Sequence, residues 1–327
     1  MSEGNGIVRR QLQEHNLQRL AAQRELYTRG KLILGIQLTL NIIVIVFISV
    51  LALVFKSQKL MQILGLAPID MSWLVTVSGV LITIIDVVIL APLVDKCRGK
   101  AAKIQEAFDC DVLSLPWNSI TVGEQLSQEE IYVNANKFKM ERGSEGFQKL
   151  RNWYCIEADT VPLNVARIIC QRSNVWWDAE LRTKFNQWLI VTSAILFGIL
   201  LGLAIWGNLT IIGFFTKVIA PFMPMLIFSV RQSFQNNQTI TTLDRLRKSA
   251  DGAYDKGISE QISDSELIDI SRRLQDNVYV HREKSPLIFD WFYRRYKNLT
   301  ENTMNASCVD LVNRYWKSRG ERQDNTL

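Results

Sequence analysis

The sequence predicts an all-α membrane protein: four transmembrane helices in two hairpins, with a helical cytosolic layer from the central segment and the C-terminal region. Three observations support this. Four apolar segments are each long enough to cross a bilayer, which takes about 20 residues. Basic residues flank these segments but are scarce in the turns between them, and the polar segments have helical patterns. Buried core helices of a soluble protein fit less well, because four such segments rarely occur in one soluble fold.

The first hairpin is predicted at residues 32–94. Its apolar segments, 32–55 and 72–94, contain almost no charged residues and are joined by the stretch KSQKLMQILGLAPIDM. This stretch has the length of an external loop between two spans. Residues 7–31, which precede the hairpin, have few helix breakers and are predicted to form a basic juxtamembrane helix.

The second hairpin is predicted at residues 188–230, a segment with no acidic residue. Gly207-Asn208 interrupts it near the middle, and this dipeptide favours a tight reversal. We therefore expect spans at 188–206 and 209–230.

Charge determines the expected orientation. Lysine and arginine are concentrated before the first span, around the central segment and after the fourth span, so the positive-inside rule places both termini on the cytosolic side. The predicted organisation is a juxtamembrane helix (1–31), a hairpin (32–94), a cytosolic helical segment (95–187), a second hairpin (188–230) and a cytosolic C-terminal region (231–327).

Composition excludes several kinds of site. The 327 residues include two histidines and five cysteines, and the cysteines are scattered. We therefore expect no disulfide framework, no metal site and no bound cofactor. No glycine-rich phosphate loop or nucleophile–base pair is present, so enzymatic activity is not expected. The net charge of +6 is ordinary for a membrane protein, and no DNA binding is expected.

Polar residues inside the spans are functional candidates, because ionisable groups in a bilayer are costly. Gln37 and Asn41 lie four residues apart on one face of the first span, Asp86 lies in the second and Lys217 in the fourth. Asp86 is expected about 13 Å and Lys217 about 21 Å from the cytosolic side. Two alternatives stay open: Asp86 and Lys217 form a structural ion pair, or they line a water-filled pore.

The central segment carries a polar stripe beside several aromatic residues. Pro162 is suited to begin a helix, and polar residues then recur at three- and four-residue steps through Arg167 to Arg182. Arginine with tryptophan and tyrosine has the chemistry to hold phosphates and stack bases. A solvated helix whose tryptophans pack against neighbours, or lie at the membrane surface, is the alternative.

Further helices are predicted in the polar segments. Ser127 begins a capping pattern for a helix over 127–140, after which Gly143, Ser144 and Gly146 predict a loop. Other helices are predicted over 96–109, 264–281 and 300–318.

Several strings resemble the SMODS-associated four-transmembrane effector family of bacterial conflict systems: LAAQRELYTRGK, FDCDVLSLPWN, NWYCIEADTVPLNVARIICQRSNVWWDAELR and RRLQDNVYVHREKSPLIFDWFYRR. They occur in the expected order around four spans. The resemblance implies an effector in the bacterial inner membrane, encoded beside a nucleotidyltransferase of the oligonucleotide-cyclase type. Infection would produce a nucleotide signal, and the effector would then compromise the membrane. No appended nucleotide-sensor domain is recognisable.

The resulting hypothesis is a pore-forming antiphage effector that acts as a homo-oligomer and is gated by a cyclic oligonucleotide. The expected ligand-binding residues are Arg167, Arg172, Arg182, Trp153, Tyr154 and Trp177, and the expected pore-lining residues are Gln37, Asn41, Asp86 and Lys217. The alternative is a membrane-anchored scaffold that recruits a cytosolic partner and conducts nothing. A secondary transporter fits less well, because few polar groups lie at the midplane.

Overall fold

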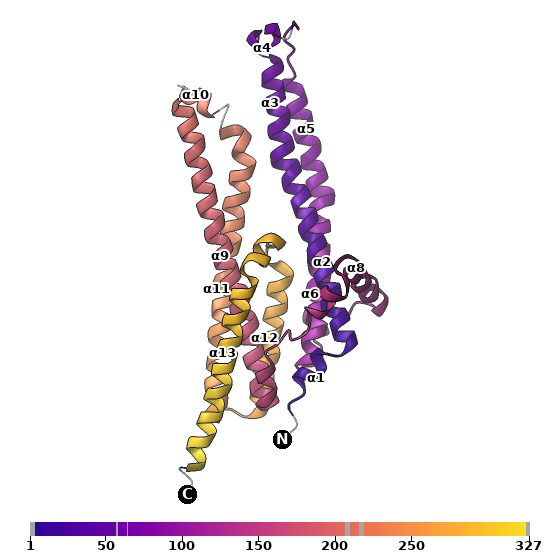
Figure 1. The fold of residues 1–327 in the computed structure, drawn as a ribbon, viewed down its shortest axis with the longest axis vertical. Coiled ribbons are helices and arrows are strands. Elements are labelled where there is room, and N and C mark those ends of the chain that lie inside the picture. The colour runs from indigo at the N-terminus through magenta and orange to yellow at the C-terminus, as the bar shows by residue number, and fades with distance from the viewer. Residues whose placement is uncertain (1–3, 57, 64, 207–209, 216–218, 325–327) are drawn as a thin grey trace. The chain divides into compact units, whose positions relative to one another are not determined.

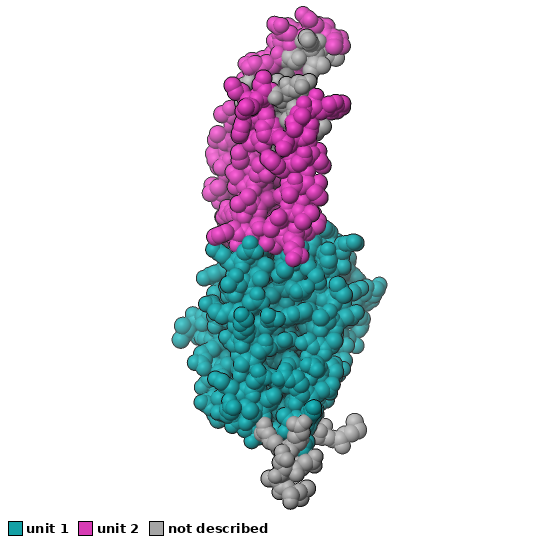
Figure 2. All heavy atoms as spheres, turned by 90° about the vertical axis from the view of Figure 1, so that its left-hand side faces the viewer, with its two compact units in different colours: residues 1–29, 97–185, 236–327 teal, residues 30–96, 186–235 magenta. Residues whose placement is uncertain are grey.

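The computed structural model describes residues 4–56, 58–63, 65–206, 210–215 and 219–324, and every regular element in these ranges is a helix (Figure 1). The chain divides into two compact units, coloured separately in Figure 2. Unit 1 comprises residues 1–29, 97–185 and 236–327, and unit 2 comprises residues 30–96 and 186–235. The prediction of an all-α membrane protein is confirmed.

Four helices have residues in both units: α2 (Glu14–Leu38), α6 (Ala91–Val112), α9 (Leu163–Trp206) and α11 (Ala220–Ile258). Each passes from a polar to an apolar sequence, or the reverse, without a break. The elements wholly in unit 1 are α1 (Ile7–Gln11), α7 (Ser119–Val122), α8 (Gln128–Gln148), the 3₁₀ helix η3 (Ile156–Thr160), α12 (Asp264–Lys284) and α13 (Asp290–Asp324).

A hydrophobic core runs through unit 1. Leu20 of α2, Phe108 of α6 and Ile169 of α9 are fully buried in it, and Leu274 of α12 packs there as well. A second cluster joins Leu181 and Phe185 of α9 to Ile288 and Phe292 near the start of α13. All five cysteines (Cys97, Cys110, Cys155, Cys170 and Cys308) are free and buried.

Side-chain caps fix the beginnings of two helices in unit 1. Ser127 Oγ accepts a hydrogen bond from the backbone N–H of Glu130 at the start of α8. Ser263 and Glu266 form a capping box at the start of α12. In such a box each side chain satisfies a backbone N–H that the helix leaves unpaired. The capping pattern predicted at Ser127 therefore marks the start of α8 correctly.

Other boundaries differ from the predictions. Residues 7–31 are not one helix, because α1 ends at Gln11 and α2 begins at Glu14. The loop predicted at Gly143 is a kink: Gly143 has φ 64° and ψ −173°, and helical structure continues on both sides of it. The last helix, α13, begins at Asp290, ten residues before the predicted start at 300.

Unit 2 contains the predicted hairpins. The first is formed by the end of α2, the π-helix η1 (Thr39–Val44), α3 (Ile45–Lys56), α4 (Gln58–Ile63), α5 (Ser72–Ile85), the π-helix η2 (Asp86–Leu90) and the start of α6. The second is formed by the end of α9, α10 (Ile211–Phe214) and the start of α11. In Figure 1, α3 and α5 run side by side.

Three helical stretches are long and apolar enough to cross a membrane: Glu14–Lys56, Trp73–Val112 and Leu163–Gly202. Large apolar side chains along them, such as Phe47, Val88 and Ile195, are exposed, as expected of surfaces that face lipid. The predicted reversal at Gly207-Asn208 lies outside the described residues, as does part of the span predicted at 209–230. The count of four spans therefore stays a prediction.

Candidate functional site

The polar side chains of the first hairpin lie at one level. The backbone N–H of Ile69 donates to Phe55 O (2.9 Å), and a Cβ on Gly79 would lie 4.0 Å from Ile45 Cδ1. Both contacts belong to one antiparallel register. Moving seven residues forward from Gly79 reaches Asp86, and moving seven back from Ile45 reaches Leu38. Asp86 is therefore level with the stretch between Gln37 and Asn41.

At this level both helices of the first hairpin contain a π-helical segment. Asn41 lies in η1, and Asp86 is the first residue of η2. π-helical turns are rare and occur frequently at functional sites. The Asn41 Nδ2 amide donates to Gln37 O (3.0 Å), so its own helix satisfies part of its hydrogen-bonding capacity. The level formed by Gln37, Asn41 and Asp86 is called the polar level below.

Asp86 is the least satisfied member of the polar level. Its Oδ1 atom is buried and has no hydrogen-bond partner among the described residues. A carboxylate in an apolar hairpin is costly unless water, a cation or a donor from another helix reaches it. Lys217, the partner proposed in one of the two alternatives, lies outside the described residues, so the choice between pairing and pore lining stays open.

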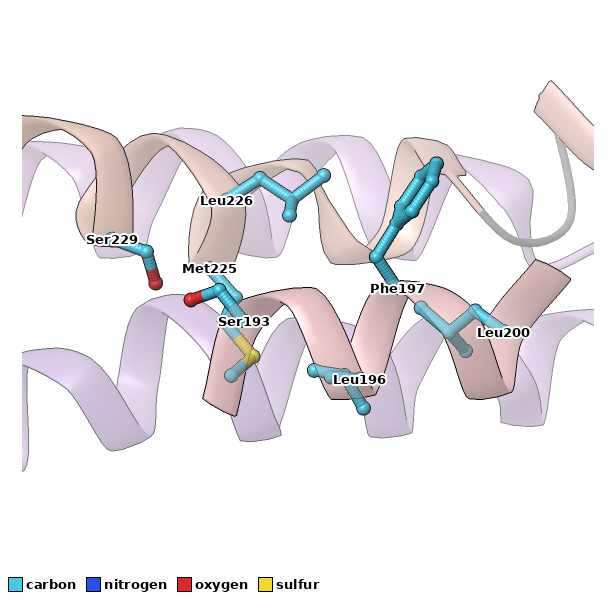
Figure 3. A pocket seen from close by; sticks show the side chains of 7 residues that line it. All are labelled: Ser193, Leu196, Phe197, Leu200, Met225, Leu226 and Ser229. Carbon is cyan, nitrogen blue, oxygen red and sulfur yellow. The ribbon is translucent and has the colours of Figure 1, made fainter. Parts of the chain in front are cut away.

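A small pocket in unit 2 lies between α9 and α11 (Figure 3). Its volume is about 230 Å³, part of which is open to the surroundings. The lining residues are Ser193, Leu196, Phe197, Leu200, Met225, Leu226 and Ser229. Apart from the two serine hydroxyls, which lie toward one end, these side chains are apolar. The pocket offers no charged group to a phosphate.

Two of the predicted ligand-binding arginines are held deep in unit 1. Arg167 donates from Nε to Leu113 O (2.6 Å) and from Nη2 to Ser114 O (2.7 Å), so it fixes the turn after α6. Arg182 Nε lies 3.0 Å from Asp178 Oδ1, and Arg182 Nη1 donates to Pro286 O (2.9 Å). The two arginines are fifteen residues apart on α9, about 22 Å, and therefore do not share one phosphate site.

Arg172 is the most accessible of the three. Its Nε donates to Asp251 Oδ1 on α11 (2.9 Å), and its Nη1 donates to Ser307 Oγ on α13 (2.7 Å). Asp251 is partly exposed. Arg172 therefore joins three helices of unit 1 through an ion pair that solvent, or a soluble anion, can reach.

The predicted stacking residues lie in two different clusters. Trp153 packs edge-on against Phe108 (ring centroids 6.1 Å apart), and Tyr154 stacks on the same ring. Trp177 packs edge-on against Tyr293 (5.6 Å). The indole N–H groups of Trp153 and Trp177 are buried and have no acceptor among the described residues. A ligand-binding role for these six residues stays a prediction.

Sequence reasoning missed a buried charged network that joins α6 to α12. Glu106 Oε1 accepts from Arg272 Nη2 (2.7 Å), and Glu106 Oε2 accepts from Gln275 Nε2 (2.7 Å). Asp109 Oδ2 accepts from Gln275 Nε2 (3.0 Å) and from Arg282 Nη1. Both carboxylates are fully buried. The sequence offers one signal for this network. Glu106 and Asp109 are three residues apart on α6, and their two arginine partners lie together on α12.

Tyr154 completes this network, called the carboxylate network below. Its hydroxyl donates to Asp109 Oδ1 (2.6 Å) and accepts from Asn174 Nδ2 (3.1 Å). Burial, and then the Asp109 charge, raise the pKa of Tyr154 well above its usual value, so the phenol keeps the proton that it donates. Burial disfavours a charged Arg282, but Asp109 outweighs this and raises the pKa of Arg282.

The same burial acts on Glu106. Loss of hydration, and then the nearby Asp109, raise its pKa, while the hydrogen bonds from Arg272 and Gln275 oppose the shift. Two carboxylates facing two guanidinium groups give a charge-balanced core, which is the form in which buried charge is tolerated. The carboxylate network therefore holds α6, α9 and α12 in one arrangement.

Comparison with known proteins agrees with the membrane architecture. A family model described as SMODS-associating 4TM effector domain matches residues 5–311. The chain is 26% identical over 293 residues to a "Probable CBASS effector molecule" of Bacillus cereus (strain VD146), covering 88% of this chain and 92% of the relative. No solved structure matches the chain. Because the family match spans both units, the chain belongs to the SMODS-associating four-transmembrane effector family.

Proposed function

We propose that this protein is a CBASS effector of a bacterial antiphage system that disrupts the inner membrane by forming a pore. The observation that carries the proposal is the polar level, where a buried Asp86 oxygen without a partner among the described residues lies at the level of two amide side chains. Water and cations that pass through an assembly of hairpins would satisfy it. Gln37, Asn41, Asp86 and Lys217 are the proposed lining residues.

Homo-oligomerisation is part of this proposal. Two hairpins per chain are too few to enclose an aqueous channel, so several copies must contribute spans. Exposed apolar side chains on the spans provide surface for lipid contact and for helix contact between copies. We propose that both termini lie in the cytosol, because basic residues are concentrated on that side of the predicted spans.

The proposed activator is a cyclic oligonucleotide made by a neighbouring nucleotidyltransferase. The relative's name as a probable CBASS effector supports such a signalling context. We propose Arg172 as the first phosphate contact, because its partner Asp251 is partly exposed and a phosphate can take its place. Arg167, Arg182, Trp153, Tyr154 and Trp177 would have to leave their present contacts to take part.

Conduction is tested with the purified full-length protein in liposomes that contain a fluorescent dye. We expect dye release when a panel of cyclic di- and trinucleotides is added, and the asparagine substitution Asp86→Asn should change the cation-to-anion selectivity measured in planar bilayers. Asp70→Asn is the matched control, because Asp70 lies in the turn of the same hairpin and pairs with Lys56 (3.0 Å). Wild-type selectivity in Asp86→Asn protein would remove Asp86 from the path.

Ligand binding is tested by calorimetry with the same nucleotides. Replacing Arg172 by alanine should weaken binding about tenfold to hundredfold, the value of a charge-assisted hydrogen bond. Arg247→Ala is the matched control, because Arg247 forms a comparable surface pair with Asp244 (3.5 Å). Tight liposomes with every nucleotide, together with a stable complex with a cytosolic protein, would favour a membrane-anchored scaffold instead.

A further inference from the structure

The first turns of α13 have one buried and one exposed face. Phe292 is almost fully buried and packs edge-on against Phe185 of α9, with ring centroids 5.1 Å apart. On the side of the helix next to Phe292 lie four exposed side chains, Trp291 (46% exposed), Arg294, Arg295 and Leu299 (60% exposed). A tryptophan, two arginines and a leucine on one side of a helix form an exposed patch that is both apolar and basic. It is called the α13 patch below.

The buried face of α13 contacts residues that directly precede the membrane-spanning segments. Arg24 Nη2 of α2 donates to the Tyr293 hydroxyl (2.7 Å), and Thr28 Oγ1 donates to Asp290 Oδ2 (3.2 Å). Thr28 is four residues before Leu32, the first residue of the apolar run, which is about 6 Å along α2. The beginning of α13 is thereby tied to the end of the polar part of α2.

The contact with α9 leads to the same conclusion. Phe185, which packs against Phe292, is three residues before Trp188, where the third apolar segment begins. That separation is about 4.5 Å along the helix. Two independent helices therefore place the start of α13 within one helical turn or so of the point where the chain becomes apolar.

The charge of the α13 patch is not neutralised within the protein. Arg294 and Arg295 have no hydrogen bond or ion pair among the described residues, whereas the nearby acids are engaged: Asp290 accepts from Thr28, and Glu301 Oε1 lies 3.5 Å from Lys297 Nζ. Two adjacent exposed guanidinium groups without a partner among the described residues are available to bind an anion.

We propose that the α13 patch docks on the surface of the bilayer in which the protein is embedded and binds the phosphates of anionic lipid headgroups through Arg294 and Arg295. Trp291 and Leu299 enter the interfacial zone beside them. Tryptophan is enriched at membrane interfaces, and each basic residue near an anionic surface strengthens binding about fivefold. The patch thus couples unit 1 to lipid charge independently of any pore or nucleotide.

The distal part of α13 provides an internal control. Trp316 is also exposed (51%) and lies near the other end of the same helix. It is seventeen residues beyond Leu299, about 26 Å away. Arg314 lies in the same region and pairs with Asp255 (3.1 Å). If the first turns of α13 lie at the membrane interface, position 299 should contact lipid and position 316 should not.

The experiment uses the full-length protein in vesicles of phosphatidylcholine with or without phosphatidylglycerol. An environment-sensitive fluorophore is attached to Leu299→Cys or, as control, to Trp316→Cys, and quenching by lipids with a headgroup-region spin label is measured. We expect quenching at 299 but not at 316, and stronger quenching when phosphatidylglycerol is present. The double substitution Arg294→Gln/Arg295→Gln should weaken docking up to about thirtyfold, whereas Arg314→Gln should leave it unchanged.

Three results would overturn the proposal. The first is equal accessibility of positions 299 and 316 to aqueous iodide in phosphatidylglycerol vesicles. The second is quenching at 299 that depends neither on phosphatidylglycerol nor on the two arginines, which would indicate apolar contact without headgroup recognition. The third is quenching at 299 that rises with phosphatidylglycerol but is unchanged in the Arg294→Gln/Arg295→Gln protein, which would indicate that other basic residues bind the headgroups.

Discussion

At the scale of single residues, the carboxylate network places two ion pairs inside the core of unit 1. Glu106 and Asp109 are fully buried, and each has a guanidinium partner on α12. A matched buried pair contributes little net stability, because dehydration of both charges offsets their attraction. Its importance lies in the cost of removing one partner.

Replacing Arg282 by methionine should therefore destabilise the protein by about 3–5 kcal/mol, because the buried Asp109 side chain loses its guanidinium partner. Denaturant unfolding in detergent micelles, followed by circular dichroism, measures the change. Glu145→Ala breaks the exposed Glu145–Lys149 pair on α8 and serves as the control, with no measurable change expected. Similar stabilities for both variants would show that Asp109 finds another partner.

His281 gives unit 1 a pH-dependent stability. Burial lowers its pKa below the ordinary value of 6.5, although the bond to Asp178 (2.7 Å) opposes this shift. The unfolded chain therefore binds a proton more readily than the folded protein. As the pH falls through 6.5 toward the lowered pKa, the contribution of His281 to the free energy of unfolding decreases by up to about 1.4 kcal/mol per unit.

His281→Asn should remove this dependence. The difference in unfolding free energy between wild type and variant, measured between pH 8 and pH 5 in about half-unit steps, isolates the histidine from the other titrating groups. A difference that stays constant across the range would contradict a lowered pKa for His281.

Sequence reasoning succeeds at residues whose environment is local. Asp86, Gln37 and Asn41 stand out because they are polar within apolar segments, and the structure places them at one level. The partners of Glu106 and Asp109 could not be found in this way, because Arg272 lies 166 residues beyond Glu106. Periodicity likewise identifies the polar side of α9, but it does not reveal that Leu113 and Pro286 carbonyls cover Arg167 and Arg182.

At the scale of secondary structure, Gly143 controls the direction of α8. Its φ of 64° and ψ of −173° are accessible essentially to glycine alone. No atom would contact a Cβ at this position, so any cost of substitution comes from the backbone. The kink separates the helix capped by Ser127 from the turns that follow.

Gly143→Ala should cost about 1–3 kcal/mol of stability, or straighten α8 at the expense of its contacts. Gly252→Ala is the matched change on α11, where a Cβ also meets no neighbour but the backbone is helical. That substitution should stabilise the protein by about 0.5–1 kcal/mol. In the same unfolding assay, we expect the two substitutions to change the free energy of unfolding in opposite directions. Changes in the same direction would show that the backbone conformations at Gly143 and Gly252 do not differ in solution.

Helix starts are more predictable than helix ends in this chain. Ser127 predicts the start of α8 because a side-chain cap is a short-range signal, and α12 begins at Asp264, where the sequence predicts it. The sequence predicts a helix over 96–109 that is separate from the span ending at residue 94, yet α6 runs from Ala91 to Val112 without a break. A change from apolar to polar composition does not stop a helix when no proline or other breaker intervenes.

At the scale of the whole molecule, the distribution of charge predicts which side of the membrane each segment occupies. The turn of the first hairpin and the polar segment after α6 should lie on opposite sides. Two exposed positions suit a test, Ile63 on α4 (81% exposed) and Ile120 on α7 (97% exposed).

A membrane-impermeant maleimide should label Ile63→Cys in intact spheroplasts and label Ile120→Cys only after lysis. Wild-type protein, whose cysteines are all buried, gives the background. Labelling of Ile120→Cys in intact spheroplasts would reverse the orientation or show that the segment crosses the membrane.

Burial of every thiol gives the folded protein an intrinsic reporter of its own opening. Burial raises the pKa of Cys110 and of Cys170, so both the reactive thiolate and its access to reagent depend on local unfolding. The alkylation rate at each cysteine thus measures how often its segment opens. Comparing Cys97 on α6 with Cys308 on α13 by mass spectrometry would show which helix loosens first upon activation, in a chain that carries no added probe.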